Sequence, residues 1–265
     1  MAQIGFGEKD IMYEDKRQVI RLSKDCWRCL EVIKDVGYAN AYTFFWSENA
    51  KLVQQAIRKI DPDIKGDWRR FKYEGKIVTF SLSDQAIIDY KSKVQEFSSF
   101  GSAVRMLGAY EDYVRKIVER SNQVIPQEMT TFRNQHNKYI RNTKSFIKFE
   151  VGRGIDFFHE VFDYNPRPSY KPSLEFFFQL RNIAVHNSGI ADQRLLDAAH
   201  SPYIGISGTL EIGEKVDWNL SVTLQLQDLL TSILPEVDPL ICHTLNLTEI
   251  EKRAYWYRNG DDEHK

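Results

Sequence analysis

The sequence predicts a mainly α-helical bundle with one or two small β-hairpins. Apolar side chains recur every three or four residues along several long stretches, as on the buried face of a helix. Patterns typical of strands occur in only two short places, residues 68–80 and 204–220. A hydrophobic fraction of 42%, with 13% aromatic residues, is typical of a folded globular protein.

Two helices are expected in the first 60 residues. Residues 14–36 show helical spacing, and Gly37 is placed to end that helix. Residues 41–60 predict a second helix, which ends before Asp61 and Pro62 because proline cannot continue it.

Residues 68–80 change to the period of strands and predict a hairpin that turns at 73–76. Arg69, Arg70 and Lys72 alternate there with aromatic residues, a pattern that can hold a nucleic-acid backbone and stack bases. A hairpin with one packed and one solvated face explains the same pattern, and we favour that explanation.

The longest helix is expected to start at Ser83, a good capping residue, and to run towards Ser121. Its apolar residues follow a near-heptad path, which suits the spine of a bundle or a dimer interface. The segment 98–101, Ser-Ser-Phe-Gly, is the one place where this helix could divide. Pro126 is expected to begin the next helix.

That next helix contains the densest positive run of the chain, with no acidic residue between Arg133 and Lys148. Charge runs are usually solvated faces, and we favour that interpretation narrowly. If the protein binds RNA, this run is the phosphate-binding surface that we expect. Its candidate residues are Arg133, Lys138, Arg141, Lys144 and Lys148.

The most informative helix is expected over residues 171–189, after a proline-rich connector. Pro172 suits a first turn, and Ser173 or Glu175 can complement the free amides there. Gly189 can turn left-handed and end the helix. Because its surface is broadly apolar, we expect most of this helix to be buried.

Arg181, Asn182 and His186 are polar groups near the end of this apolar helix. Asn182 and His186 share a face, and the long side chain of Arg181 can reach the same edge. The planar fork of arginine matches a phosphate, and neutral histidine accepts a proton near pH 7. These groups can drive attack of an RNA 2′-hydroxyl on its phosphate without a metal. The structural alternative to catalysis is that Arg181 and His186 stabilise the end of the helix, by interacting with its dipole and by donating to its last carbonyls.

The segment Arg181-Asn-x-x-x-His186, followed by Asn-x-Gly, resembles the signature of the HEPN superfamily. Residues 100–120, an apolar run that contains Glu111-Asp-Tyr113, are similar to an early helix of that family. The resemblance covers roughly residues 95–245. It implies a helical bundle and a dimer that joins two Arg/His sets in one cleft.

The resemblance also implies metal-independent endoribonuclease activity, and many such proteins are toxins or antiphage effectors. Carried over to this chain, it makes Arg181 and His186 the catalytic pair and Asn182 a positioning group. Glu111 becomes a weaker candidate for a polar residue that faces them. The motif of each chain offers one His, so a symmetric dimer would supply the second. The alternative is a non-catalytic dimeric module that binds RNA or a protein.

Four further elements are expected after Gly189. They are a short helix over 192–200, a hairpin from 204–212 and 216–220, a helix over 223–241 kinked or interrupted at Pro235, and a short helix over 247–258. The expected organisation is an N-terminal helical section with a hairpin over residues 1–90. A bundle that carries the Arg181/His186 motif follows over 91–258, with a frayed tail over 259–265.

Charge and cysteine usage limit the possible functions. Thirty-six basic against 37 acidic residues exclude a generally basic RNA binder, so RNA contacts must be local.

Cys26 and Cys29 form a lone Cys-x-x-Cys inside a predicted helix. A zinc site needs further ligands, so both are expected to be buried and reduced. No metal or other cofactor is expected, because no His-x-x-x-His or paired-carboxylate cluster occurs.

Location and partners follow from the same observations. No apolar run approaches the roughly 18 residues that span a membrane, and the first residues lack the layout of a signal peptide. We therefore expect a cytoplasmic protein without a membrane partner. Its expected partners are an RNA substrate, a second copy in a homodimer, and an antitoxin or sensor protein that restrains it.

Overall fold

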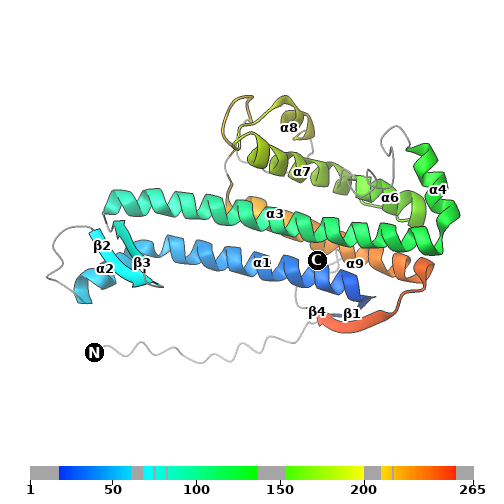
Figure 1. Cartoon of the computed structure of the whole chain (residues 1–265), viewed down its shortest axis with the longest axis horizontal. Coiled ribbons are helices and arrows are strands. Elements are labelled where there is room, and N and C mark those ends of the chain that lie inside the picture. Colours follow the sequence, from blue (N-terminus) through cyan, green and yellow to red (C-terminus); the bar gives the residue numbers. More distant parts are fainter. Residues whose placement is uncertain are drawn as a thin grey trace, which may run out of the picture.

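The computed structural model describes residues 18–60, 68–73, 76–81, 83–136, 153–199, 210–216 and 218–254. Within these ranges the chain is mainly helical, which confirms the predicted fold class. Figure 1 shows three long helices lying side by side. They are α1 (Lys24–Glu48), α3 (Asp84–Val124) and α9 (Leu220–Leu245).

Shorter helices form a second layer on α3 and α9 (Figure 1). They are α4 (Pro126–Gln135), α6 (Arg153–Phe162), α7 (Tyr170–His186) and α8 (Gln193–Ala198). α2 (Ala50–Ile60) lies beside the start of α3. A single cluster of buried side chains joins the two layers, and its largest fully buried members are Tyr110, Tyr113, Phe157, Phe158 and Phe176.

Two antiparallel strand pairs complete the described fold. β2 (Trp68–Tyr73) and β3 (Lys76–Ser81) form the predicted first hairpin. β1 (Gln18–Ser23) pairs with β4 (Glu249–Ala254), so the two ends of the described chain meet. Residues 204–209 and 217 of the predicted second hairpin lie outside the described residues. None of its described residues belongs to a strand, and Leu220 begins α9.

Two predicted helices are wrong where these end strands form. Residues 18–23 and 249–254 are strands, because each supplies the other with its ladder of backbone hydrogen bonds. The indole Nε1 of Trp27 also donates to the carbonyl of Ile250 at 2.8 Å, which fixes β4 over the start of α1. Residues 14–17 and 255–258 of these predictions lie outside the described residues.

Gly37 does not end α1, which continues to Glu48, and the break before α2 falls at Asn49. Gly37 is buried, and a Cβ added there would lie 1.9 Å from Oε1 of Gln227 on α9. Because Gly37 has no side chain, α1 and α9 can pack closely at this point. Its effect on helix termination is overridden by this packing.

The predicted start of α3 is confirmed, because the side chain of Ser83 accepts a hydrogen bond from the amide of Ala86 at 3.1 Å. The helix runs through residues 98–101 without dividing, and Pro126 begins α4 as predicted. The domain boundary expected near residue 90 lies inside α3. Residues of α1 such as Leu30 belong to the same core as α3 and α9, so α1 is part of the bundle.

α9 is one helix from Leu220 to Leu245 and contains both Pro235 and Pro239, so Pro235 does not interrupt it. Asn219 caps its start by accepting a hydrogen bond from the amide of Val222 at 3.2 Å. The predicted helix after Asp192 is confirmed as α8, where the Asp192 side chain accepts from the amide of Leu195 at 3.0 Å.

We expect Gly154→Ala to destabilise the fold by about 1–3 kcal/mol, because overpacking a filled core forces neighbours to move. A Cβ at Gly154 would lie 2.9 Å from the hydroxyl of Tyr110, which is fully buried. Within the described part of the chain that hydroxyl has no hydrogen-bond partner, so Tyr110→Phe should cost little. Urea unfolding of both single variants and the double variant checks this, and failure of Tyr110→Phe to restore stability would contradict it.

Candidate functional site at the end of helix α7

The candidate helix α7 is buried along most of its length, as predicted. Its buried residues include Leu174, three consecutive phenylalanines at 176–178, Leu180 and Ile183. The helix starts at Tyr170, one residue earlier than expected. Pro172 therefore lies in the first turn and Ser173 one turn in from Ser169, whose carbonyl accepts the Ser173 amide at 3.0 Å.

α7 ends in a tight left-handed turn. The amides of Asn187 and Gly189 both donate to the carbonyl of Ile183, at 2.8 and 3.0 Å. Ser188 and Gly189 have φ values of 53° and 79°, so Gly189 adopts the conformation that the sequence predicted. This turn leaves the last helical residue, His186, exposed at the surface beside Val185, which is 53% exposed.

Arg181 is held by a carboxylate from another helix. Its Nη1 donates to Oε1 of Glu111 on α3 at 2.9 Å, and its Cζ lies 5.1 Å from the ring centroid of Phe178. The two side chains of the ion pair are 23% and 38% exposed, Arg181 the less so. The structure thus brings together two of the candidate residues, and their roles in chemistry stay predictions.

Asn182 is half-buried and shares a face of α7 with His186, since the two residues are four positions apart. Arg181 and His186 are five residues apart, which at 3.6 residues per turn places them about 140° apart around the helix. The guanidinium of Arg181 donates to Glu111 on α3. The helix by itself therefore does not bring the two residues to one face, and the expectation that the long side chain of Arg181 reaches the edge of His186 stays a prediction.

The expected RNA-binding run is described only at its start. Arg133 donates to Oδ1 of Asn122, and Nε2 of His136 lies 2.8 Å from a carboxylate oxygen of Glu160. Lys138, Arg141, Lys144 and Lys148 lie outside the described residues. Figure 1 places α4, which carries Arg133, at the opposite end of its layer from α8, which follows His186.

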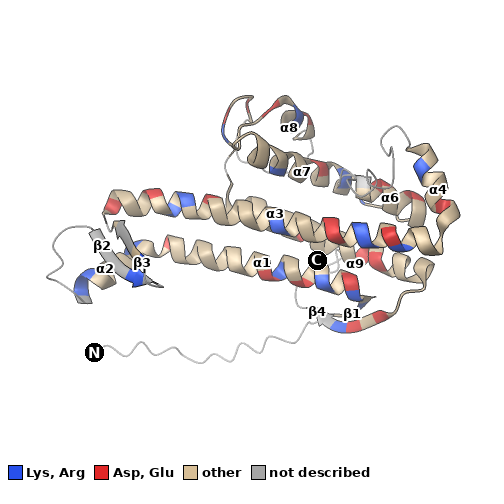
Figure 2. Cartoon of the chain, viewed as in Figure 1, with Lys and Arg blue, Asp and Glu red and all other residues tan. Residues whose placement is uncertain are grey.

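Figure 2 shows acidic and basic residues interspersed along the described helices, most clearly in the second half of α3. In this view no broad face carries one sign of charge. An RNA contact on these helices would therefore be local.

The cysteines are buried, as the sequence predicted for Cys26 and Cys29. Both lie in α1, and Sγ of Cys26 is 3.9 Å from the carbonyl of Leu234. Burial raises the pKa of both thiols, and it raises that of Cys242 to about 12. These thiols are therefore protonated at neutral pH. Among the described residues, no group of His, Cys, Asp and Glu side chains could hold a metal ion.

The sequence did not single out Asp238, whose side chain is fully buried on α9. It accepts hydrogen bonds from the amide and hydroxyl of Ser23 at 2.5 and 2.7 Å and from the hydroxyl of Tyr113 at 2.6 Å. Burial and the nearby carboxylate raise the pKa of Tyr113, which keeps its hydroxyl a donor. Asp238 thus joins the start of α1, the middle of α3 and α9.

A second carboxylate of α9, Glu236, holds the connector that leads into α7. It accepts hydrogen bonds from the hydroxyl of Tyr164 at 2.8 Å, from Arg167 at 2.9 Å and from the hydroxyl of Tyr170 at 3.1 Å. The connector is therefore tied to the bundle on the side away from His186, and α7 starts from a fixed position.

Comparisons of the chain with models of known protein families, with curated proteins and with solved structures found no match. The likeness to the HEPN superfamily therefore rests on the residues quoted above. In the part of the chain that the structure describes, no helix is both long and apolar enough to cross a membrane.

Proposed function

We propose that the protein is a metal-independent endoribonuclease that uses Arg181 and His186. The observation that carries the proposal is an exposed imidazole at the end of a buried helix, five residues after a guanidinium that Glu111 holds. The helix thus presents an imidazole open to solvent and a guanidinium fixed by an ion pair, which are the two groups that the proposed chemistry needs.

In the proposed reaction His186 accepts the proton of an RNA 2′-hydroxyl, whose oxygen then attacks the adjacent phosphate. Arg181 stabilises the charge of the phosphorane. Guanidinium has five N–H donors, and the bond to Glu111 occupies one nitrogen, so donors remain for phosphate oxygens. Protonation of the departing 5′-oxygen leaves a 2′,3′-cyclic phosphate and a 5′-hydroxyl. Asn182, on the face of His186, would position substrate.

A homodimer completes this proposal. Since Arg181 and His186 leave α7 in directions about 140° apart, a two-fold axis near the end of α7 would supply the missing acid or base from the second copy. Glu111 would act as a positioning residue for Arg181. As a toxin or defence effector in the cytoplasm, such an enzyme would need an antitoxin or sensor protein to restrain it.

The test is cleavage of total RNA by the purified protein, with and without EDTA. We expect fragments with 2′,3′-cyclic phosphate ends and the same rate in both conditions, because no step uses a metal. Loss of cleavage in EDTA would contradict metal independence. Expression in a host should be toxic for the native chain and harmless for His186→Ala.

A non-catalytic binding module is the second candidate. Aromatic side chains are exposed along the second half of α1 and the first half of α3, and exposed apolar surface of this kind often marks an interaction site. Tyr38, Tyr42, Phe45, Trp46 and Phe97 are 58%, 66%, 58%, 51% and 74% exposed. This candidate predicts no RNA cleavage in either condition, and RNA or protein binding that survives substitution of Arg181 and His186.

A further inference from the structure

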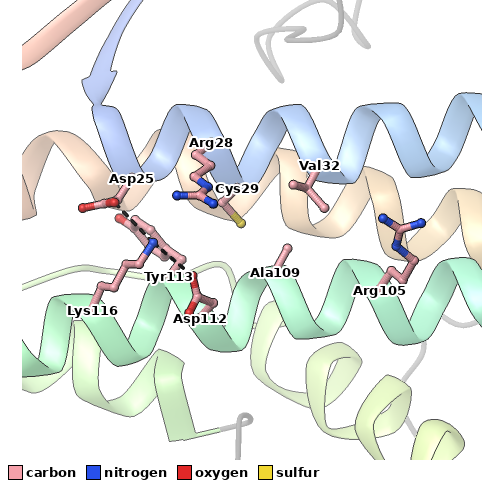
Figure 3. A pocket seen from close by; sticks show the side chains of 9 residues that line it. All are labelled: Asp25, Arg28, Cys29, Val32, Arg105, Ala109, Asp112, Tyr113 and Lys116. Atoms are coloured by element: carbon pink, nitrogen blue, oxygen red, sulfur yellow. Dashed lines mark hydrogen bonds and ion pairs between the residues drawn. The ribbon is translucent and has the colours of Figure 1, made fainter.

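We propose that a pocket between α1 and α3 binds the phosphate group of a small phosphate ester. The cavity has a volume of about 230 Å³ and is drawn in Figure 3. It is distinct from the α7 site. Arg105, Asp112 and Lys116 line it from α3, whereas Glu111 of the same helix contacts Arg181 of α7.

Two arginines give the pocket its positive charge. Arg28 enters it from α1 and Arg105 from α3, and Figure 3 shows each guanidinium pointing across the gap towards the facing helix. Within the described ranges neither forms a salt bridge or a side-chain hydrogen bond, so both forks are open to an anion. Guanidinium binds phosphate oxygens with two parallel N–H donors. Figure 3 shows Val32 and Ala109 between the two arginines, so one guanidinium can bind the phosphate while the other adds to the positive charge of the pocket.

The carboxylates of the pocket are already neutralised. Asp25 is bonded to Arg120 at 2.6 Å and lies 3.4 Å from Lys116, and its side chain is 14% exposed. Asp112 accepts from Lys116 at 3.0 Å and from Arg115. These pairs hold one end of the pocket rigid and leave Arg28 and Arg105 as its unbalanced charges.

Size and lining favour a small ester. Pockets for drug-sized ligands are usually about 300–1,000 Å³, so this cavity fits a phosphate with a small attached group. Between the arginines its wall is formed by Val32 and Ala109, with the buried Cys29 beside them. This apolar wall can contact the organic part of an ester, which inorganic phosphate lacks.

The experiment is calorimetric titration of the full-length chain with phenyl phosphate, inorganic phosphate and phenol at about 0.1 M salt. We expect phenyl phosphate to bind most tightly, inorganic phosphate more weakly and phenol not at all. Arg28→Gln and Arg105→Gln should each weaken binding of phenyl phosphate about tenfold or more, since each removes one of the two unbalanced positive charges of the pocket.

The matched control is Arg194→Gln, which removes the same charge from an exposed position on α8. It should bind phenyl phosphate as the native chain does. Thermal unfolding should show that all three variants are folded, because none of these arginines is buried. The proposal is overturned if the native chain does not bind phenyl phosphate, if phenol binds as well, or if the pocket variants behave like the control. RNA cleavage by the native chain is a separate readout, so failure of either proposal is distinguishable.

Discussion

His186→Ala is expected to lower the rate of RNA cleavage about 10²–10⁴-fold, the usual contribution of a general acid or base. The fold should be unaffected, because His186 is exposed and is the last residue of α7. Loss of an imidazole near the helix C-terminus costs about 0.3–1 kcal/mol at most sites. The measurement is the initial rate on a defined RNA, alongside the thermal unfolding of both proteins.

The matched control is His243→Ala. His243 is also exposed and also lies in the last turn of a helix, α9, but it has no part in the proposed site. We expect its variant to cleave RNA at the native rate. The catalytic assignment is wrong if His186→Ala cleaves as fast as the native chain, or if both histidine variants lose activity equally.

Asp238→Asn is expected to destabilise the fold by several kcal/mol, because each buried donor left without its acceptor costs about 1–3 kcal/mol. The carboxylate accepts from Ser23 through both oxygens and from the hydroxyl of Tyr113. An asparagine amide would replace one acceptor by a donor that faces other donors. Since domains are stable by about 5–15 kcal/mol in total, we expect a large fall in the urea midpoint.

Tyr113→Phe provides the graded comparison, because it removes one donor and leaves the carboxylate its two bonds from Ser23. It should cost about 1–2 kcal/mol, the usual range for one hydrogen bond. An Asp238→Asn variant that loses less free energy of unfolding than Tyr113→Phe would show that Asp238 does not hold these three elements together.

The features that local sequence could predict are those with local causes. Ser83 caps α3 through an amide three residues away, and Pro126 begins α4 for the same kind of reason. Gly37 was expected to end a helix, but its role depends on Gln227, far along the chain on α9. β1 and β4 were missed because neither strand has a reason to form until it meets the other.

The candidate sites also divide into residues that a local motif could reveal and residues that only the packing of helices brings together. Arg181 and His186 stand in one short pattern and could be found there, and the helix resemblance pointed to Glu111 before its contact with Arg181 was seen. Arg28 and Arg105 come from separate helices and belong to no local motif, so only the packing of α1 on α3 brings them together. Asp238 had one signal, its place with Glu236 between Pro235 and Pro239 in a largely apolar part of α9.

Because β1 pairs with β4, the fold cannot be completed until residues 249–254 have been synthesised. The ladder joins residues 18–23 to 249–254, and the Trp27 indole bonds to Ile250. While the ribosome is still making α9, residues 18–23 have no strand to pair with and expose their backbone N–H and C=O groups, which can pair with other chains. A nascent chain interrupted before residue 249 would keep that edge permanently, so we expect it to aggregate or to be degraded.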